Sequence, residues 1–206
     1  MTLAFLAAVG ALALLTVLPS PDFAITVRWA IAGGRRAGFL TILGIQVGIL
    51  VWGALAVAGL AALFAASPVA YTVVRIAGAG YLVWMAARLI GRSFGTAATA
   101  SGPVAVGSGS TAFPQGLLTN LLNPKIAAFY VGVLPALVPA GAPPALTMAA
   151  LILCHVVLGV AWLGICTVAV AGGRSVLGRP SVRRWLDRFT GVVLLGFATR
   201  LAFDAG

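Results

Sequence analysis

The chain has 206 residues, of which 62% are hydrophobic and only 8% are charged, and its formal net charge is +10. A soluble domain usually has about 25% charged residues, so this composition excludes an ordinary soluble protein and predicts an all-α integral membrane protein. The positive charge does not indicate nucleic-acid binding, because the arginines cluster at the ends of apolar segments, where membrane orientation accounts for them.

Six apolar segments are each long enough, at about 20 residues, to cross a bilayer as a helix. They fall at 3–32, 38–64, 69–90, 113–138, 145–171 and 188–204. The stretch 93–112 is rich in glycine, serine and alanine, and we expect it to be a flexible cytoplasmic linker. The sequence therefore predicts one transmembrane domain, 1–206, made of two three-helix halves, 1–92 and 113–206.

The first segment is interrupted by Ser20, Pro21 and Asp22. Serine is a good N-cap, and proline is favoured at the first helical position because its missing N–H is not needed there. The motif predicts that one half-helix ends here and another begins, with Asp22 in its first turn. A carboxylate at the centre of a membrane helix costs about 2.5–3.5 kcal/mol, so Asp22 is a functional candidate.

The fourth segment is interrupted in the same way, by Asn123, Pro124 and Lys125, and Lys125 is the only lysine in the chain. Asparagine is also a good N-cap, so the same local structure is expected, with the opposite charge at the equivalent position. The two breaks therefore predict a pair of half-helix N-termini, one carrying Asp22 and the other Lys125.

The third segments of the two halves are also alike. Residues 75–82 align without gaps with residues 188–195, and both stretches have arginine first, glycine fourth and leucine last. Because each half has three spans, an odd number, the second half must insert upside down. We therefore expect six transmembrane helices in a 3+3 inverted repeat, with helices 1 and 4 broken, an arrangement that points to a substrate site near the membrane midplane.

The basic residues set the expected orientation. If the turn at 33–36 is cytoplasmic, only Arg75 and Arg200 lie near the opposite face, and this positive-inside bias places both termini outside. The basic residues on the cytoplasmic side are then Arg28, Arg35, Arg36, Arg88, Arg92, Arg174, Arg179, Arg183, Arg184 and Arg188.

Three motifs occur in order along nearly the whole chain: 19–23 with the Gly/Arg-rich turn 33–38, then the third-helix stretch 78–84, then 113–125. Together they resemble the LysE/RhtB family of amino-acid exporters. The chain departs from the family pattern at three positions, which are Ser20 in place of glycine, Ile126 in place of alanine and Ala136 in place of glutamine. The resemblance implies export of amino acids or related small metabolites across the bacterial inner membrane, driven by the proton gradient.

A zwitterionic amino acid suits the two breaks chemically, with its ammonium at Asp22 and its carboxylate at Lys125 and at free N–H groups of the half-helices. Burial favours the neutral form of Asp22 and a nearby cation favours the charged form, so a proton and substrate could compete for it. The candidate substrate-binding residues are Ser20, Pro21, Asp22, Tyr81, Asn120, Asn123, Pro124, Lys125, Phe129 and Tyr130. The candidates for proton coupling are Asp22, Gln46 and His155.

Four of these residues also have a structural interpretation. Asp22 could serve only as a helix-terminus carboxylate and Lys125 only as its counter-ion. Gln46 and His155 could be hydrogen-bonded core residues between helices. Gly44 and Gly48 form a small-xxx-small ridge, which indicates close helix packing within the chain or in a homo-oligomer.

Three other functions compete with amino-acid export. A metal-cation exporter would need a richer ligand set than one Asp, one His and a nearby Lys. A membrane thiol-disulfide carrier would need cysteines on the broken helices, whereas Cys154 and Cys166 both fall in the fifth segment. A non-transporting assembly subunit would tolerate apolar residues at Asp22 and Lys125. No cofactor, metal site or enzyme activity is expected, since the sequence has no nucleophile–base pattern and no phosphate-binding loop.

Overall fold

The computed structural model describes residues 2–66, 109–139 and 141–171, together with separate residues between 69 and 91 and between 188 and 199. The regular structure in this part of the chain is helical, without a strand. The linker predicted at 93–112 lies outside the described residues up to 108, as do most of the third and sixth predicted spans. The described fold therefore concerns the first two helices of each predicted half.

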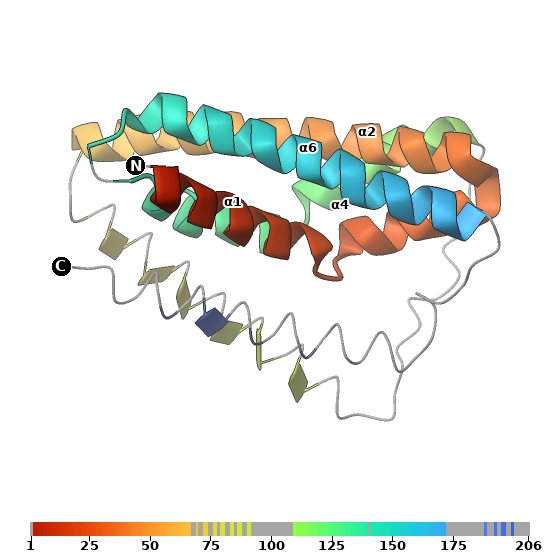
Figure 1. Ribbon diagram of the computed structural model, residues 1–206, viewed down its shortest axis with the longest axis horizontal. Helices are drawn as coiled ribbons and strands as arrows, with labels where there is room; N and C mark the ends of the chain where they lie inside the picture. Colours follow the sequence, from red (N-terminus) through yellow and green to blue (C-terminus); the bar gives the residue numbers. More distant parts are fainter. Residues whose placement is uncertain are drawn as a thin grey trace.

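The first predicted span is broken where the motif expects it to be. Helix α1 covers Thr2–Val17, and α2 begins at Pro21 and is assigned to Ala66. Within α2, Gly34 has φ 70°, a left-handed conformation that favours glycine, and Figure 1 shows the chain reversing direction there. The first span thus consists of α1 and the part of α2 before Gly34, and the second span is the long remainder of α2.

The second half repeats this order. A short 3-10 turn, η1 (Gly109–Thr111), leads into α4 (Ala112–Leu121), and α5 (Pro124–Ala128) follows the break. A π-helical turn, η2 (Phe129–Val133), and a 3-10 turn, η3 (Pro135–Leu137), complete the span. Gly141 then has φ 79°, and α6 (Pro144–Ala171) runs back along the molecule. In Figure 1, α4 enters from the end of the molecule opposite to α1, so the two broken helices run in opposite directions.

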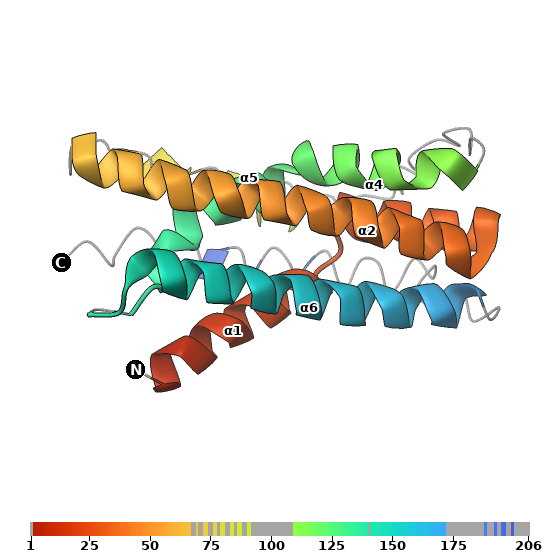
Figure 2. The same cartoon turned by 90° about the horizontal axis from the view of Figure 1, so that it is seen from above.

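Close backbone contacts hold α4 against α2. A Cβ on Gly44 would collide with the backbone of α4 at Phe113, and one on Gly116 would collide with the backbone of α2 at Thr41. Gly48 lies against the side chain of Asn120 in the same way. The glycine ridge of the second span therefore serves packing within the chain. Helix α6 packs on another side of α2, as Figure 2 shows.

Among the described residues, the outer faces are apolar, and several polar side chains are buried within a mostly apolar core, whereas a soluble domain exposes its polar groups. Exposed positions on the outer faces include Leu55, Val157 and Ile165, which are 58%, 66% and 64% exposed. The buried polar residues are Asp22, Thr26, Thr41, Gln46, Asn120, Asn123, Lys125, His155 and Thr167. This distribution suits a protein surrounded by lipid.

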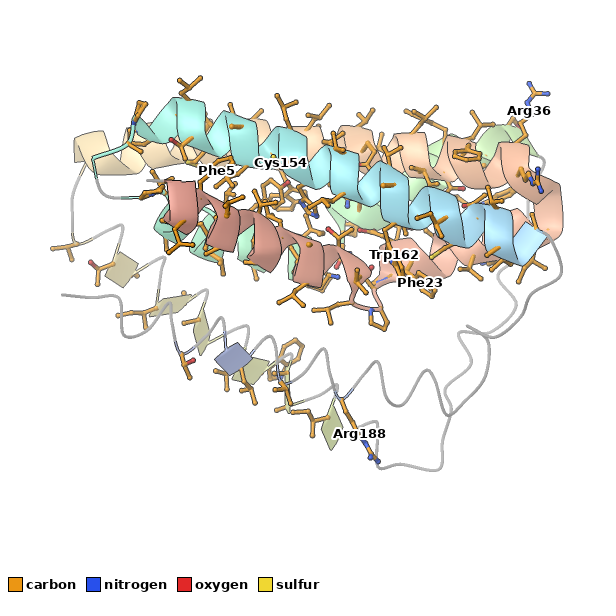
Figure 3. The ribbon with its side chains drawn as sticks, viewed as in Figure 1. Phe5, Phe23, Arg36, Cys154, Trp162 and Arg188 are labelled. Carbon is orange, nitrogen blue, oxygen red and sulfur yellow. The ribbon has the colours of Figure 1, made fainter. Side chains whose placement is uncertain are left out.

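Within the described residues, two stretches are long and apolar enough to cross a membrane: Pro21–Gly59, which includes the reversal at Gly34, and Pro144–Ala171. Two shorter apolar helices, Leu3–Val17 and Pro124–Val133, belong to the broken spans. Arg36 lies beside the Gly34 reversal, and its side chain points away from the end of the helices (Figure 3). The predicted count of six spans remains a prediction.

Candidate functional site

The first break has the predicted N-cap. The Ser20 hydroxyl accepts a hydrogen bond from the backbone N–H of Phe23 at 3.3 Å, and the Ser20 carbonyl accepts the first helical bond, from Ala24, at 3.0 Å. Pro21 occupies the first helical position, where an N–H is not needed. This geometry fixes Asp22 in the first turn, next to the positive end of the helix dipole.

The second break reproduces the first. The side-chain oxygen of Asn123 accepts a hydrogen bond from the backbone N–H of Lys125 at 3.1 Å, and the Asn123 carbonyl accepts one from Ala127, also at 3.1 Å. Pro124 again takes the first helical position. The two motifs therefore form the same local structure and hold a carboxylate and an ammonium at equivalent positions, as the sequence predicts.

Asp22 binds the other broken helix. Its Oδ2 accepts hydrogen bonds from Asn120 Nδ2 at 2.8 Å and from Asn123 Nδ2 at 3.0 Å, and the residue is only 5% exposed. The second oxygen, Oδ1, is also buried and has no hydrogen-bond partner among the described residues. The carboxylate is thus anchored through one oxygen, and the other is available to a ligand.

Lys125 binds the first broken helix in return. Its ammonium donates to the carbonyls of Leu15 at 3.0 Å and Leu18 at 3.3 Å, at the C-terminal end of α1. The last carbonyls of a helix have no partner within it, and a cation there is favoured by the helix dipole. Since an ammonium has three donors, one N–H of Lys125 remains for another acceptor.

The two charges share a cavity without touching. Within the described part of the chain, the side-chain hydrogen bonds of Asp22 and Lys125 go to amides and carbonyls, and none joins the two side chains. The cavity has a volume of about 20 Å³. It has room for about one water molecule and too little space for an amino acid. Its lining residues are Leu15, Thr16, Ser20, Asp22, Ile45, Gln46, Ile49, Lys125, Ile126, His155, Gly159 and Leu163.

His155 enters the cavity from α6 and is fixed by an aromatic cluster. The Tyr130 hydroxyl lies 2.8 Å from His155 Nδ1, and the two rings stack with centroids 5.7 Å apart. Phe129 meets both rings, at centroid distances of 6.1 and 6.5 Å. Phe129 and Tyr130 belong to the π-helical turn η2, a feature that occurs often at functional sites.

Gln46 reaches the same cavity from α2. It is 5% exposed, and both atoms of its amide group are buried without a hydrogen-bond partner in the part of the chain that the structure describes. The amide lies against Gly159 of α6, where an added Cβ would come within 2.8 Å of Nε2. Gln46 and His155, which the sequence places in the second span of each half, therefore meet at one site.

Most of the predicted site residues come together, in two roles. Ser20, Asp22, Gln46, Lys125 and His155 line the cavity. Asn120 and Asn123 hold Asp22, the two prolines start the half-helices, and Phe129 and Tyr130 pack around His155. Tyr81 lies outside the described residues.

Sequence reasoning missed most of the apolar lining and one hydroxyl, Thr16. These residues look like any others in apolar helices, but helical spacing carries a signal for some of them. Gly159 and Leu163 follow His155 at steps of four, and Ile49 flanks Gln46 one turn later. A search for the helix face shared with the polar candidates would have found them.

The described residues contain no group of three or more His, Cys, Asp or Glu side chains that could hold a metal ion. Cys154 and Cys166 are both free thiols, and both lie on α6 rather than on a broken helix. Neither a metal site nor a redox pair is thus present in this part of the chain.

Comparison with known proteins gives consistent matches over nearly the whole chain. The model of a family described as LysE type translocator matches residues 13–205. The threonine efflux protein of Escherichia coli K12 is 29% identical over 187 residues, which cover 89% of each chain. The leucine efflux protein of Klebsiella pneumoniae is 29% identical over 198 residues, covering 94% of this chain and 92% of that protein. An uncharacterized membrane protein of Bacillus subtilis, YrhP, is 24% identical over 197 residues. No solved structure matches the chain.

Proposed function

Because the chain belongs to the LysE type translocator family, and is therefore a membrane transporter and not an enzyme, we propose that it exports amino acids across the bacterial inner membrane in exchange for protons. The observation that carries this proposal is the shared cavity of Asp22 and Lys125, each charge held by the opposite broken helix. The efflux of threonine and of leucine named for its relatives supports amino acids as the substrate class.

The substrate binds through the hydrogen-bonding groups of Asp22 and Lys125 that the described part of the protein does not use. Its α-ammonium donates to Asp22 Oδ1, the oxygen that is without a partner among the described residues. Its α-carboxylate accepts from the N–H of Lys125 that does not bind α1. Both bonds are charge-assisted, which makes them about twice as strong as neutral ones. Recognition thus uses hydrogen-bonding positions that the anchoring of the two side chains leaves free.

The cavity has to widen before an amino acid can enter, since it has room for about one water molecule. The hydrogen bonds that Asn120 and Asn123 donate to Asp22, and that Lys125 donates to α1, tie the two broken helices together at this point. We propose that the site opens when one half rocks against the other in a six-span, 3+3 inverted repeat, as in other transporters of that kind. Both termini then lie outside, and Arg35 and Arg36, exposed at the Gly34 reversal, face the cytoplasm.

Protons are exchanged at Asp22, and His155 is the second candidate for this role. A carboxylate that binds either the substrate ammonium or a proton couples the two by competition, because it cannot hold both. His155 lines the same cavity, and its Nδ1 is engaged by Tyr130. Gln46, the third candidate, has an amide that does not ionise, so it contributes hydrogen bonds rather than a proton site.

The test is efflux from proteoliposomes loaded with a labelled amino-acid mixture, with and without an imposed pH gradient. The wild type is expected to lose a few amino acids faster under the gradient, and Asp22→Asn to lose that stimulation. Thr41→Val is the matched control, since Thr41 is buried, donates to the Ala37 carbonyl of its own helix at 2.9 Å and does not line the cavity. Full gradient-driven export by Asp22→Asn would remove Asp22 from the coupling, and a wild type that releases no amino acid would refute the proposed substrate class.

A further inference from the structure

Asp22 and Lys125 cannot distinguish one amino acid from another. In the proposed function, on which this inference rests, they bind the ammonium and carboxylate groups that all amino acids share. Selection among side chains therefore falls to another group that lines the cavity. Its polar candidates are Thr16, Ser20, Gln46 and His155.

Three of these four groups already have partners. The Thr16 hydroxyl donates to the Leu12 carbonyl at 2.7 Å, and the Ser20 hydroxyl caps α2. His155 Nδ1 is bonded to Tyr130. Gln46 differs, because neither its amide nitrogen nor its amide oxygen has a hydrogen-bond partner among the described residues, although the residue is only 5% exposed. A buried amide in that condition gains from a ligand that bonds to it, because it gives up no other hydrogen bond in exchange.

The position of the amide is fixed by its surroundings. Gly159 leaves the space that the Gln46 amide occupies, since a Cβ there would lie 2.8 Å from Nε2. The lining of the cavity also includes the apolar side chains of Ile45, Ile49 and Leu163. A ligand group at this point therefore meets one donor and one acceptor within an apolar lining. A hydroxyl on a short side chain fits, because it both donates and accepts.

We infer that Gln46 is the specificity-determining residue of the site and that it selects amino acids with a short, hydroxyl-bearing side chain. A site built to bond a hydroxyl discriminates strongly against an analogue that lacks it, because its polar groups then stay unpaired. Threonine and valine form the sharpest pair of probes, since they have nearly the same shape and differ by a hydroxyl in place of a methyl group.

The experiment measures kcat/KM for threonine and for valine in proteoliposomes containing the wild type or Gln46→Met. Methionine has about the length of glutamine and lacks its hydrogen-bonding groups. The wild type is expected to prefer threonine by about tenfold or more, the effect of one hydrogen bond. In Gln46→Met the ratio falls to within about threefold of unity, through lower kcat/KM for threonine. An unchanged ratio in a transporting Gln46→Met would overturn the inference.

Two further variants keep the test decisive. Gly159→Ala displaces the amide without altering Gln46 itself, so it is expected to lower the same ratio even where Gln46→Met does not fold. Thr41→Val removes a buried hydroxyl that does not line the cavity, and it is expected to leave the ratio unchanged. If the wild type transports threonine and valine equally well, the inference is refuted and the proposed function stands. If the wild type transports no amino acid at all, the proposed function itself is refuted.

Discussion

Replacing Asn123 separates two contributions that one side chain makes at the second helix break. Its oxygen caps α5 through the N–H of Lys125, and its amide nitrogen donates to Asp22 at 3.0 Å. Loss of an N-cap costs about 0.5–2 kcal/mol, and loss of a hydrogen bond to a charged group about 1.5–3 kcal/mol. Asn123→Ala removes both, so it should lower the free energy of unfolding by about 2–5 kcal/mol. Asn123→Ser keeps a capping hydroxyl, as Ser20 does at the first break, and should lose only about 1.5–3 kcal/mol.

Equilibrium unfolding of the purified protein in detergent measures these differences. Ser20→Ala is the matched control, because it removes a cap and no bond between the broken helices, and it should cost about 0.5–2 kcal/mol. The reasoning fails if Asn123→Ser is as stable as the wild type, since the bond to Asp22 would then contribute nothing. It also fails if the serine and alanine variants are equally unstable, since the cap would then be irrelevant.

Two other substitutions test the packing around the site. Gly44→Ala should destabilise the protein by about 1–3 kcal/mol, because its Cβ would meet the backbone of α4, which cannot move aside as a side chain can. Gly59→Ala is the control in the same unfolding assay. A Cβ there meets nothing within 4 Å, so this variant should be neutral or slightly stabilising. Tyr130→Phe leaves His155 Nδ1 without its 2.8 Å partner and should lower the free energy of unfolding by about 1–3 kcal/mol. Unfolding and transport are measured in parallel. An unchanged stability would show that the buried pair contributes nothing to the fold.

The sequence was sufficient to predict both helix breaks because their cause is local. Ser20 and Asn123 cap, and Pro21 and Pro124 start, the half-helices that follow, and each of these effects operates within three or four residues. The reversal at Gly34 follows in the same way from two adjacent glycines. Such features do not depend on how the helices are arranged in space.

The partners of the side chains could not be predicted, because they depend on the rotation and depth of helices far apart in the chain. The sequence assigned both charges to one substrate site and left open whether they pair directly. They do share a cavity, but each is bound by neutral groups of the opposite break. His155 and Tyr130 were separate candidates in the sequence, and their hydrogen bond joins α6 to a π-helical turn that no sequence pattern indicated.

The difference between the two breaks follows from the hydrogen-bonding groups that are unpaired at the end of a helix. An ammonium finds acceptors at the C-terminal end of any helix, because the last carbonyls are unpaired there, and Lys125 uses those of Leu15 and Leu18. A carboxylate finds none of the donors it needs at such an end, so the chain must supply them from side chains. Asn120 and Asn123 do so, whereas the equivalent positions of the first half are Val17 and Ser20. The two asparagines are therefore the consequence of placing the acidic residue in the first half and the basic residue in the second.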